Sequence, residues 1–227
     1  MATDTEVVDL RTMALEAQAD RATTVFDDLE PGATVVLVTD GDAKPLLARL
    51  QDARPGWVEW FLLEGGPPRT RVVVRRRAKA APRGVSEFLG LDHHRLDEIL
   101  EAVDQLCRQN AWSEAATRFD EFACGLNWHI DAEEQVLFPH FEAVTGMTTG
   151  PTTVMRAEHV RIRQHMAELR LALGAAEPDV CRQVLAGLVD VLSSHNLKEE
   201  HVLYPMTDRL SASADDRDAL VQAIQRA

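Results

Sequence analysis

The sequence predicts an α+β protein of two domains, in which a small βαβαββ two-layer domain precedes an up-down antiparallel four-helix bundle. Three observations support this prediction. The first part alternates short apolar strands with helices, separated by turns rich in Pro and Gly. The second part changes to long stretches in which apolar residues recur every three or four positions. All eight histidines lie between positions 93 and 201, so the candidate chemistry belongs to the second part.

The first domain is expected over residues 1–80. Strands are predicted at residues 7–10, 33–38, 57–63 and 71–77, and helices at residues 14–29 and 44–53. Pro45 is tolerated in the first turn of the second helix. Elements in this order pack as helices on a sheet. The stretch of residues 78–84 has the character of a linker and leads into the second domain, which is expected over residues 81–227.

Four long helices and one short one are predicted in the second domain. They cover residues 86–108, 113–138, 151–174, 178–205 and 214–226. Ser86 and Ser113 are the expected N-caps of the first two helices, and Pro139 is expected to end the second. Pro151 and Pro178 open the third and fourth helices. Because the connecting loops are short, consecutive helices must be antiparallel neighbours, which makes an up-down bundle.

Composition excludes several classes of partner. The net charge of -13 argues against binding to nucleic acid. No apolar run approaches the ~18 residues that span a membrane. The first residues lack the basic region and apolar stretch of a signal peptide, so a cytoplasmic protein is expected. Cys107, Cys124 and Cys181 have neither metal-type nor redox-type spacing, and we interpret them as small buried hydrophobic residues.

The second domain contains an internal repeat at an offset of 66 residues. The first two helices are therefore a copy of the third and fourth, and packing the two hairpins together gives pseudo-two-fold symmetry. The repeat pairs Asp92-His93 with Glu158-His159, His129 with His195, Glu133-Glu134 with Glu199-Glu200, and Leu137-Phe138-Pro139 with Leu203-Tyr204-Pro205.

Four histidines and two glutamates of this repeat fall on the predicted buried seam of the bundle. Around them the seam steps by three and four residues, through Leu126, His129, Glu133 and Val136, and through Leu192, His195, Glu199, Val202 and Met206. Two unpaired carboxylates at one level of a core would cost several kcal/mol and repel each other. Metal ions bound by these residues remove both problems. The alternative is that the six residues form a polar network in the core or lie at the surface.

The predicted metal ligands are therefore His93, His129, Glu133, His159, His195 and Glu199. Each metal takes two histidines, and the two glutamates bridge the metals, which leaves a position open for a small molecule. Mixed imidazole and carboxylate ligation suits iron or manganese better than a structural zinc.

The other histidines and acidic residues near the motifs are not expected to bind the metals directly. His94 should point ~100° away from His93. His140, His165 and His201 are off the ligand face or beyond the proline, although His165 could act as a distal group. Glu134 and Glu200 are expected beside the ligands or at the surface, with ligation as the alternative.

These motifs resemble the hemerythrin-like (HHE cation-binding) family over residues 86–210. Two His-x-x-x-Glu motifs, His129 to Glu133 and His195 to Glu199, each follow a helix with a histidine at the same offset. The resemblance implies a non-haem pair of iron ions with an oxo or hydroxo bridge, for which zinc or manganese could substitute. Oxygen-carrying hemerythrins have a fifth histidine where this sequence has Arg163. The resemblance therefore favours redox, peroxide or nitric oxide chemistry, or sensing, over oxygen transport.

The first domain resembles a domain of unknown function that has the fold of the TusA/SirA-like sulfur carriers. Those carriers need a cysteine at the start of the first helix, and this chain has none before Cys107, which excludes sulfur transfer. A protein partner for this domain is expected instead. For the whole chain we expect binding or sensing of oxygen, nitric oxide or peroxide with a redox change. The alternatives are an enzyme that disproportionates peroxide or reduces nitric oxide, and a protein that handles iron or zinc.

Overall fold

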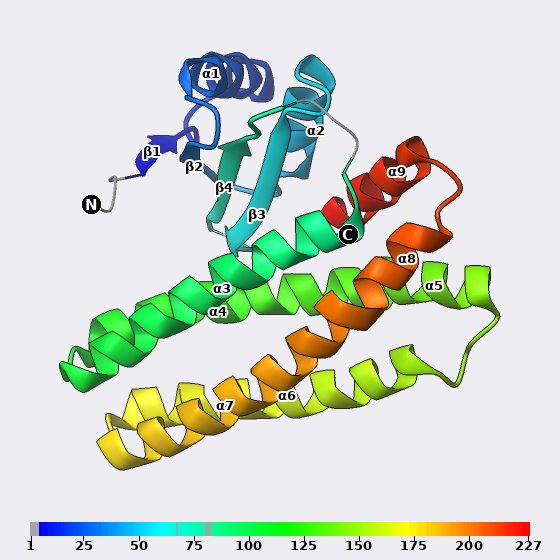
Figure 1. Cartoon of the computed structure of the whole chain (residues 1–227). Helices are drawn as coiled ribbons and strands as arrows, with labels where there is room; N and C mark the ends of the chain where they lie inside the picture. The colour runs from blue at the N-terminus through cyan, green and yellow to red at the C-terminus, as the bar shows by residue number, and fades with distance from the viewer. Residues whose placement is uncertain (1–4, 67, 80–82) are drawn as a thin grey trace. The chain divides into compact units, whose positions relative to one another are not determined.

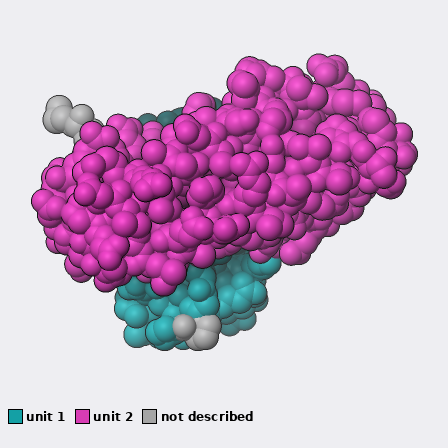
Figure 2. Space-filling model, turned by 90° about the horizontal axis from the view of Figure 1, so that it is seen from below, with its two compact units in different colours: residues 1–82 teal, residues 83–227 magenta. Residues whose placement is uncertain are grey.

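The structure, a computed structural model, describes residues 5–66, 68–79 and 83–227 (Figure 1). The chain divides into two compact units, residues 1–82 and residues 83–227 (Figure 2). The boundary falls within the predicted linker, of which residues 80–82 lie outside the described residues. No helix among the described residues combines the length and the apolar character that a membrane crossing requires.

The first unit has the predicted βαβαββ order. Its elements are β1 (Glu6–Asp9), α1 (Leu15–Asp28), β2 (Thr34–Thr39), α2 (Lys44–Ala53), β3 (Val58–Glu64) and β4 (Thr70–Arg76). The strands form one sheet in the order β1-β2-β4-β3. β1 and β2 are parallel, as a helical crossover between them requires, and the other two pairings are antiparallel.

The helices α1 and α2 of this unit cover one face of the sheet. Phe26 of α1 and Leu50 of α2 pack with Val35 and Leu37, which alternate along β2. Because successive side chains of a strand point to opposite faces, the residue between them, Val36, belongs to a separate cluster on the other face. This alternation explains why β2 is apolar along its whole length.

The second unit is built from two long helical hairpins that lie side by side (Figure 1). The first runs through α3 (Val85–Arg108), α4 (Trp112–Ala132), η1 (Glu133–Leu137) and α5 (Phe138–Thr145). The second runs through α6 (Pro151–Ala175), α7 (Pro178–Lys198), η2 (Glu199–Leu203) and α8 (Tyr204–Leu210), and α9 (Ala214–Gln225) closes the chain. A core that includes Leu100, Phe119, Leu169 and Leu188 fills the space between the four long helices.

The expected end of the second helix at Pro139 is wrong, because the chain continues helically to Thr145. The reason is a π-helical segment, η1, in which the Phe138 N–H donates to the Glu133 carbonyl five residues back. η2 repeats this arrangement, with the Tyr204 N–H donating to the Glu199 carbonyl. A wider turn relieves the clash that a proline ring makes with the carbonyl four residues back. Pro139 and Pro205 therefore lie inside long helices, and Gly146, at φ 71°, ends the first of them.

The predicted N-caps are also wrong. Gly84 precedes α3, whose first two N–H groups, of Val85 and Ser86, donate to the carboxylate of Asp208 at 2.7 and 3.1 Å. A Cβ on Gly84 would lie 2.6 Å from that carboxylate, so a larger residue here would displace the Asp208 side chain from the cap. The cap thus comes from the far end of the sequence, and Ser113 lies one residue inside α4, where its side chain makes no cap hydrogen bond.

Candidate metal centre

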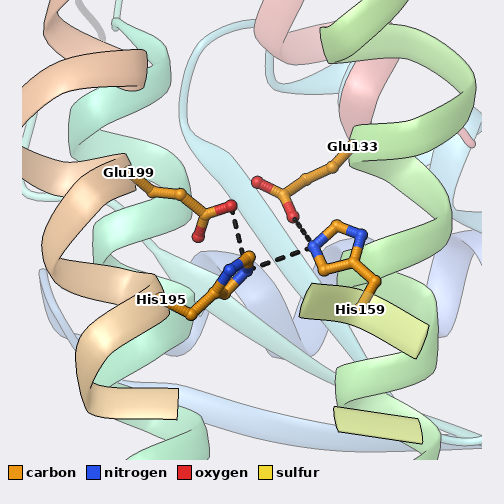
Figure 3. Close-up of side chains that lie close together, drawn as sticks. All are labelled: Glu133, His159, His195 and Glu199. Carbon is orange, nitrogen blue, oxygen red and sulfur yellow. Dashed lines mark hydrogen bonds and ion pairs between the residues drawn. The ribbon is translucent and has the colours of Figure 1, made fainter. Parts of the chain in front are cut away.

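The six predicted ligands converge in the core of the second unit. His93 lies on α3, His129 on α4, His159 on α6 and His195 on α7, while Glu133 and Glu199 begin η1 and η2. None of the six is more than 3% exposed. Figure 3 shows four of these side chains, those of Glu133, His159, His195 and Glu199, directed at one another.

The histidines form two pairs through their Nε2 atoms. In the first pair, His93 Nε2 lies 3.2 Å from His129 Nε2, and in the second, His159 Nε2 lies 3.1 Å from His195 Nε2. Two nitrogen ligands at adjacent positions around one metal, each ~2.1 Å from it, lie ~3 Å apart. Each pair is therefore spaced to hold one metal ion.

Each glutamate lies close to one histidine of each pair. Glu199 Oε2 is 3.4 Å from His93 Nε2, and Glu199 Oε1 is 3.1 Å from His195 Nε2. Glu133 Oε2 is 3.3 Å from His159 Nε2 and 3.8 Å from His129 Nε2. The carboxylates thus have the positions of bridging ligands.

Two of these carboxylate oxygens, Glu133 Oε2 and Glu199 Oε1, are buried and accept no hydrogen bond from the described residues. Their nearest polar neighbours are the Nε2 atoms of His159 and His195, at 3.3 and 3.1 Å, and a buried carboxylate oxygen that forms no hydrogen bond is unfavourable. A cation between the histidine pairs would satisfy both oxygens. The donor set, four imidazole nitrogens and two carboxylates, therefore fits a pair of metal ions, and His-Glu groups from both pairs lie within ligand distance of one another.

A second layer of carboxylates fixes the orientation of each histidine. The Nδ1 atoms of His93, His129, His159 and His195 lie 2.7–3.0 Å from Glu200, Asp92, Glu134 and Glu158 respectively. An Nδ1–H bonded to a carboxylate leaves the Nε2 lone pair free to face a metal, and such outer partners raise the basicity of the ligand. Glu134 and Glu200 thus lie beside the ligands, as expected. The roles of Asp92 and Glu158 were not predicted.

This outer layer also joins the four helices in a ring. Asp92 on α3 holds the histidine of α4, and Glu134 after α4 holds that of α6. Glu158 on α6 holds the histidine of α7, and Glu200 after α7 holds that of α3. Every one of these carboxylates is the chain neighbour of a ligand on its own helix. One residue pair per helix therefore supplies both a ligand and the orientation of the next ligand.

The π-helical segments change the register of the buried face after each glutamate. The seam predicted Val202 and Met206 as core positions, but Val202 is 52% exposed, whereas Leu203 is 2% exposed and Thr207 is buried. A π-turn contains one residue more than the α-helical step, so every later position moves on by one. That shift directs Tyr204 into the centre.

Tyr204 also lies at the centre, where no role was predicted for it from the sequence. Its fully buried hydroxyl donates to Glu133 Oε1 at 2.7 Å and to Glu199 Oε2 at 3.1 Å, and it lies 3.3 Å from the Nε2 atoms of both His93 and His129. The repeat did contain the signal, because Tyr204 is matched by Phe138 and is the only tyrosine of the chain.

The remaining histidines stay outside the centre, as predicted. His94 and His201 are exposed, His140 is half-buried, and His165 lies near Glu168 and Gly187. Arg163, at the position of the expected fifth histidine, turns outward. Its guanidinium pairs with Asp131 and lies 3.7 Å from Glu134, so it provides no ligand.

Burial and neighbouring charges shift the pKa values of the buried groups in the metal-free centre. Burial disfavours the charged form of His93, but the carboxylates Glu199 and Glu200 outweigh it and raise the pKa of His93 to about 10. Burial likewise opposes and Glu199 favours the charged form of His195, whose pKa rises to about 9. Burial, together with the negative charge of Glu133 and Glu199, raises the pKa of Tyr204 well above its usual value. Without metal, protonated His93 and His195 therefore offset the negative charge of the buried glutamates.

A four-helix bundle with paired histidines, two buried glutamates between them and outer carboxylates defines a class of metal-binding protein with its site in the bundle core. The model of the hemerythrin HHE cation-binding domain matches residues 85–207, more than half of the chain. The chain therefore belongs to the hemerythrin HHE family, as the motifs predicted. The model of DUF2249, an uncharacterized conserved protein, matches residues 7–76. No curated protein and no solved structure matches the chain significantly.

Proposed function

We propose that the second unit holds two iron ions, one at each histidine pair, and that Glu133 and Glu199 bridge them. The metal pair binds a small molecule such as oxygen, nitric oxide or peroxide, with a change in redox state. The observation that carries the proposal is the convergence of four Nε2 atoms on two buried carboxylates, of which Glu133 Oε2 and Glu199 Oε1 form no hydrogen bond with the described residues. Iron accepts this donor set and changes oxidation state, which zinc does not.

Binding or sensing is favoured over rapid turnover by the shortage of free acid–base groups. Among the described residues that face the ligands, the outer carboxylates are each engaged with a histidine Nδ1. General acid–base catalysis needs a group that is free to exchange a proton with the substrate. In this proposal the first unit transmits the state of the metal pair to a protein partner, and the net charge of -13 disfavours nucleic acid in that role.

Metal analysis with absorption spectroscopy tests the proposal. Protein produced with iron is expected to contain two irons per chain and to show the charge-transfer absorption of an oxo-bridged ferric pair. Nitric oxide added to the reduced protein is expected to form a stable adduct. One zinc per chain would overturn the iron pair. Rapid consumption of peroxide or nitric oxide by protein that keeps its oxo-bridge absorption would overturn binding in favour of an enzyme.

The bridges have their own test. Glu133→Ala and Glu199→Ala are each expected to reduce the metal content below two per chain, because each change removes a ligand from both metals. Glu168→Ala, on the half-exposed side chain near His165, is the matched control and should keep two metals. If both bridge variants retain two metals per chain, these glutamates are not bridges.

A further inference from the structure

Tyr204 breaks the two-fold symmetry of the centre at one atom. Its ring centroid lies 5.7 Å from that of His93, and the ring of its repeat partner, Phe138, lies 5.6 Å from that of His159. Both rings are fully buried. The two rings therefore take matching places in the two halves, but only the first pair, His93 and His129, faces a hydroxyl.

The Tyr204 hydroxyl has the spacing of a metal ligand rather than only of a hydrogen-bond donor. It lies 2.7–3.3 Å from one oxygen of each bridging glutamate and from both Nε2 atoms of the first pair. Those two Nε2 atoms are 3.2 Å apart, and His93 Nε2 is 3.4 Å from Glu199 Oε2. Donors at adjacent positions around one metal ion are ~3 Å apart. The Tyr204 hydroxyl thus adds a fourth donor to His93, His129 and Glu199 at the first pair.

The second pair, His159 and His195, faces no hydroxyl in the described part of the chain. Its carboxylate oxygens are Glu133 Oε2 and Glu199 Oε1, the two without hydrogen bonds among the described residues. Phe138 stacks on His159 at an interplanar angle of 13° and offers only carbon. Arg163 points away, to Asp131. The second pair therefore takes its remaining donors from carboxylates alone, and the place that the Tyr204 hydroxyl fills at the first pair has only carbon at the second.

From this difference we propose that Tyr204 is a ligand of the metal at His93 and His129, and that a small exogenous ligand binds the metal at His159 and His195, beside Phe138. The inference rests on the proposed metal pair and deepens it. On coordination the phenol O–H bond breaks, an O–metal bond forms, and the proton leaves to solvent; metal sites release ligand protons in this way. The apolar Phe138 leaves the remaining position to the exogenous ligand.

The wild-type protein alone can overturn the ligand assignment. Ferric phenolate absorbs in the visible and gives phenolate ring modes in resonance Raman spectra, and because the chain has a single tyrosine, any such signal must come from Tyr204. Ferric-loaded protein is expected to show this signal, and Tyr204→Phe, which reproduces the Phe138 half, is expected to lose it. Protein with two irons per chain and no phenolate modes would overturn the proposal while leaving the proposed function intact.

Azide, a small anion that binds ferric iron, tests the open position. Wild-type protein and Tyr204→Phe are both expected to bind azide at the second metal and to show its charge-transfer band. Phe138→Tyr adds a hydroxyl at the matching place, so it is expected to strengthen the phenolate signal and to lose azide binding. Azide binding that survives in Phe138→Tyr at unchanged metal content would show that the open position is not beside Phe138 and would overturn the proposal. Metal content is measured for every variant, so a failure to hold two irons is recognised separately as a failure of the proposed function.

Discussion

At the scale of single residues, the centre depends on which ring nitrogen of each histidine faces inward. All four Nδ1 atoms bond outward to carboxylates, and all four Nε2 atoms converge. Asp92 has the most enclosed position of these carboxylates, since it is fully buried and also bonds Arg95 at 2.7 Å. The inward lone pairs are therefore set by side chains that never touch the metal.

Asp92→Ala is expected to weaken metal binding by about 10–100-fold, because His129 loses the partner that fixes its ring and raises its basicity. Competition with a chelator of known affinity measures the change. Asp120→Ala is the matched control, since it removes a surface carboxylate that pairs with Arg170. Equal metal affinity in Asp92→Ala and wild-type protein would show that this carboxylate does not support the ligand.

The metal-free protein is expected to lose stability as the pH rises from ~6.5 to ~10. The pKa values of His93 and His195 are about 10 and about 9 in the folded state, against ~6.5 in an unfolded chain. The folded state therefore binds more protons across this window, and its stability is greatest below it and falls through it. Thermal unfolding of metal-free protein across this range measures the effect. A constant Tm from pH ~6.5 to ~10 would contradict it.

The sequence alone predicted all six residues that converge at the centre, because a repeat of polar residues on an apolar seam is a local pattern. It did not predict the pairing of Asp92 with His129 or of Glu158 with His195, since these contacts join different helices. Tyr204 was missed for another reason. Periodicity assigned the buried face beyond Glu199 to Val202 and Met206, and this register was wrong by one residue.

At the scale of elements, the π-helical segments η1 and η2 combine three features that the sequence presents separately. Each begins at a glutamate of the centre, carries the chain past a proline, and moves the buried face on by one residue. Such segments are frequent at functional sites. A proline in a helical pattern predicted an end, because one extra residue in a turn leaves no trace in composition.

Leu203→Ala is expected to cost about 2–5 kcal/mol of unfolding free energy, whereas Val202→Ala should change it by less than about 0.5 kcal/mol. In a regular α-helix, Val202 would take the seam position instead. The exposed fractions are 2% for Leu203 and 52% for Val202. Denaturant unfolding of the two variants at equal metal content measures both values. The reverse order of the two costs would contradict the π-helical register.

At the scale of the whole molecule, the two units differ in how much their sequences reveal. The strand and helix order of the first unit was predicted from turns and apolar runs, and it is confirmed. Its role stays a prediction, because the matching family model describes an uncharacterized protein. The unit also lacks the cysteine that sulfur transfer would require. The bundle and its centre were predicted more fully, since buried histidines and glutamates restrict the chemistry that a core can perform.

Residues 83–227 produced alone are expected to fold and to hold the same number of metals as the full chain. The bundle core consists of residues of this unit, and its N-terminal cap, Asp208, belongs to it as well. Far-ultraviolet circular dichroism and metal analysis of this fragment measure the outcome. A fragment that is helical but metal-free would show that the first unit is needed for the centre.

The central claim is that two metals lie in the bundle core, one at each histidine pair. A crystal of iron-loaded protein, measured with X-rays at the iron absorption edge, tests it most directly. The anomalous difference map is expected to contain two peaks, one beside the Nε2 atoms of His93 and His129 and one beside those of His159 and His195, with Glu133 and Glu199 in contact with both. A single peak, or peaks only at surface residues, would contradict the account.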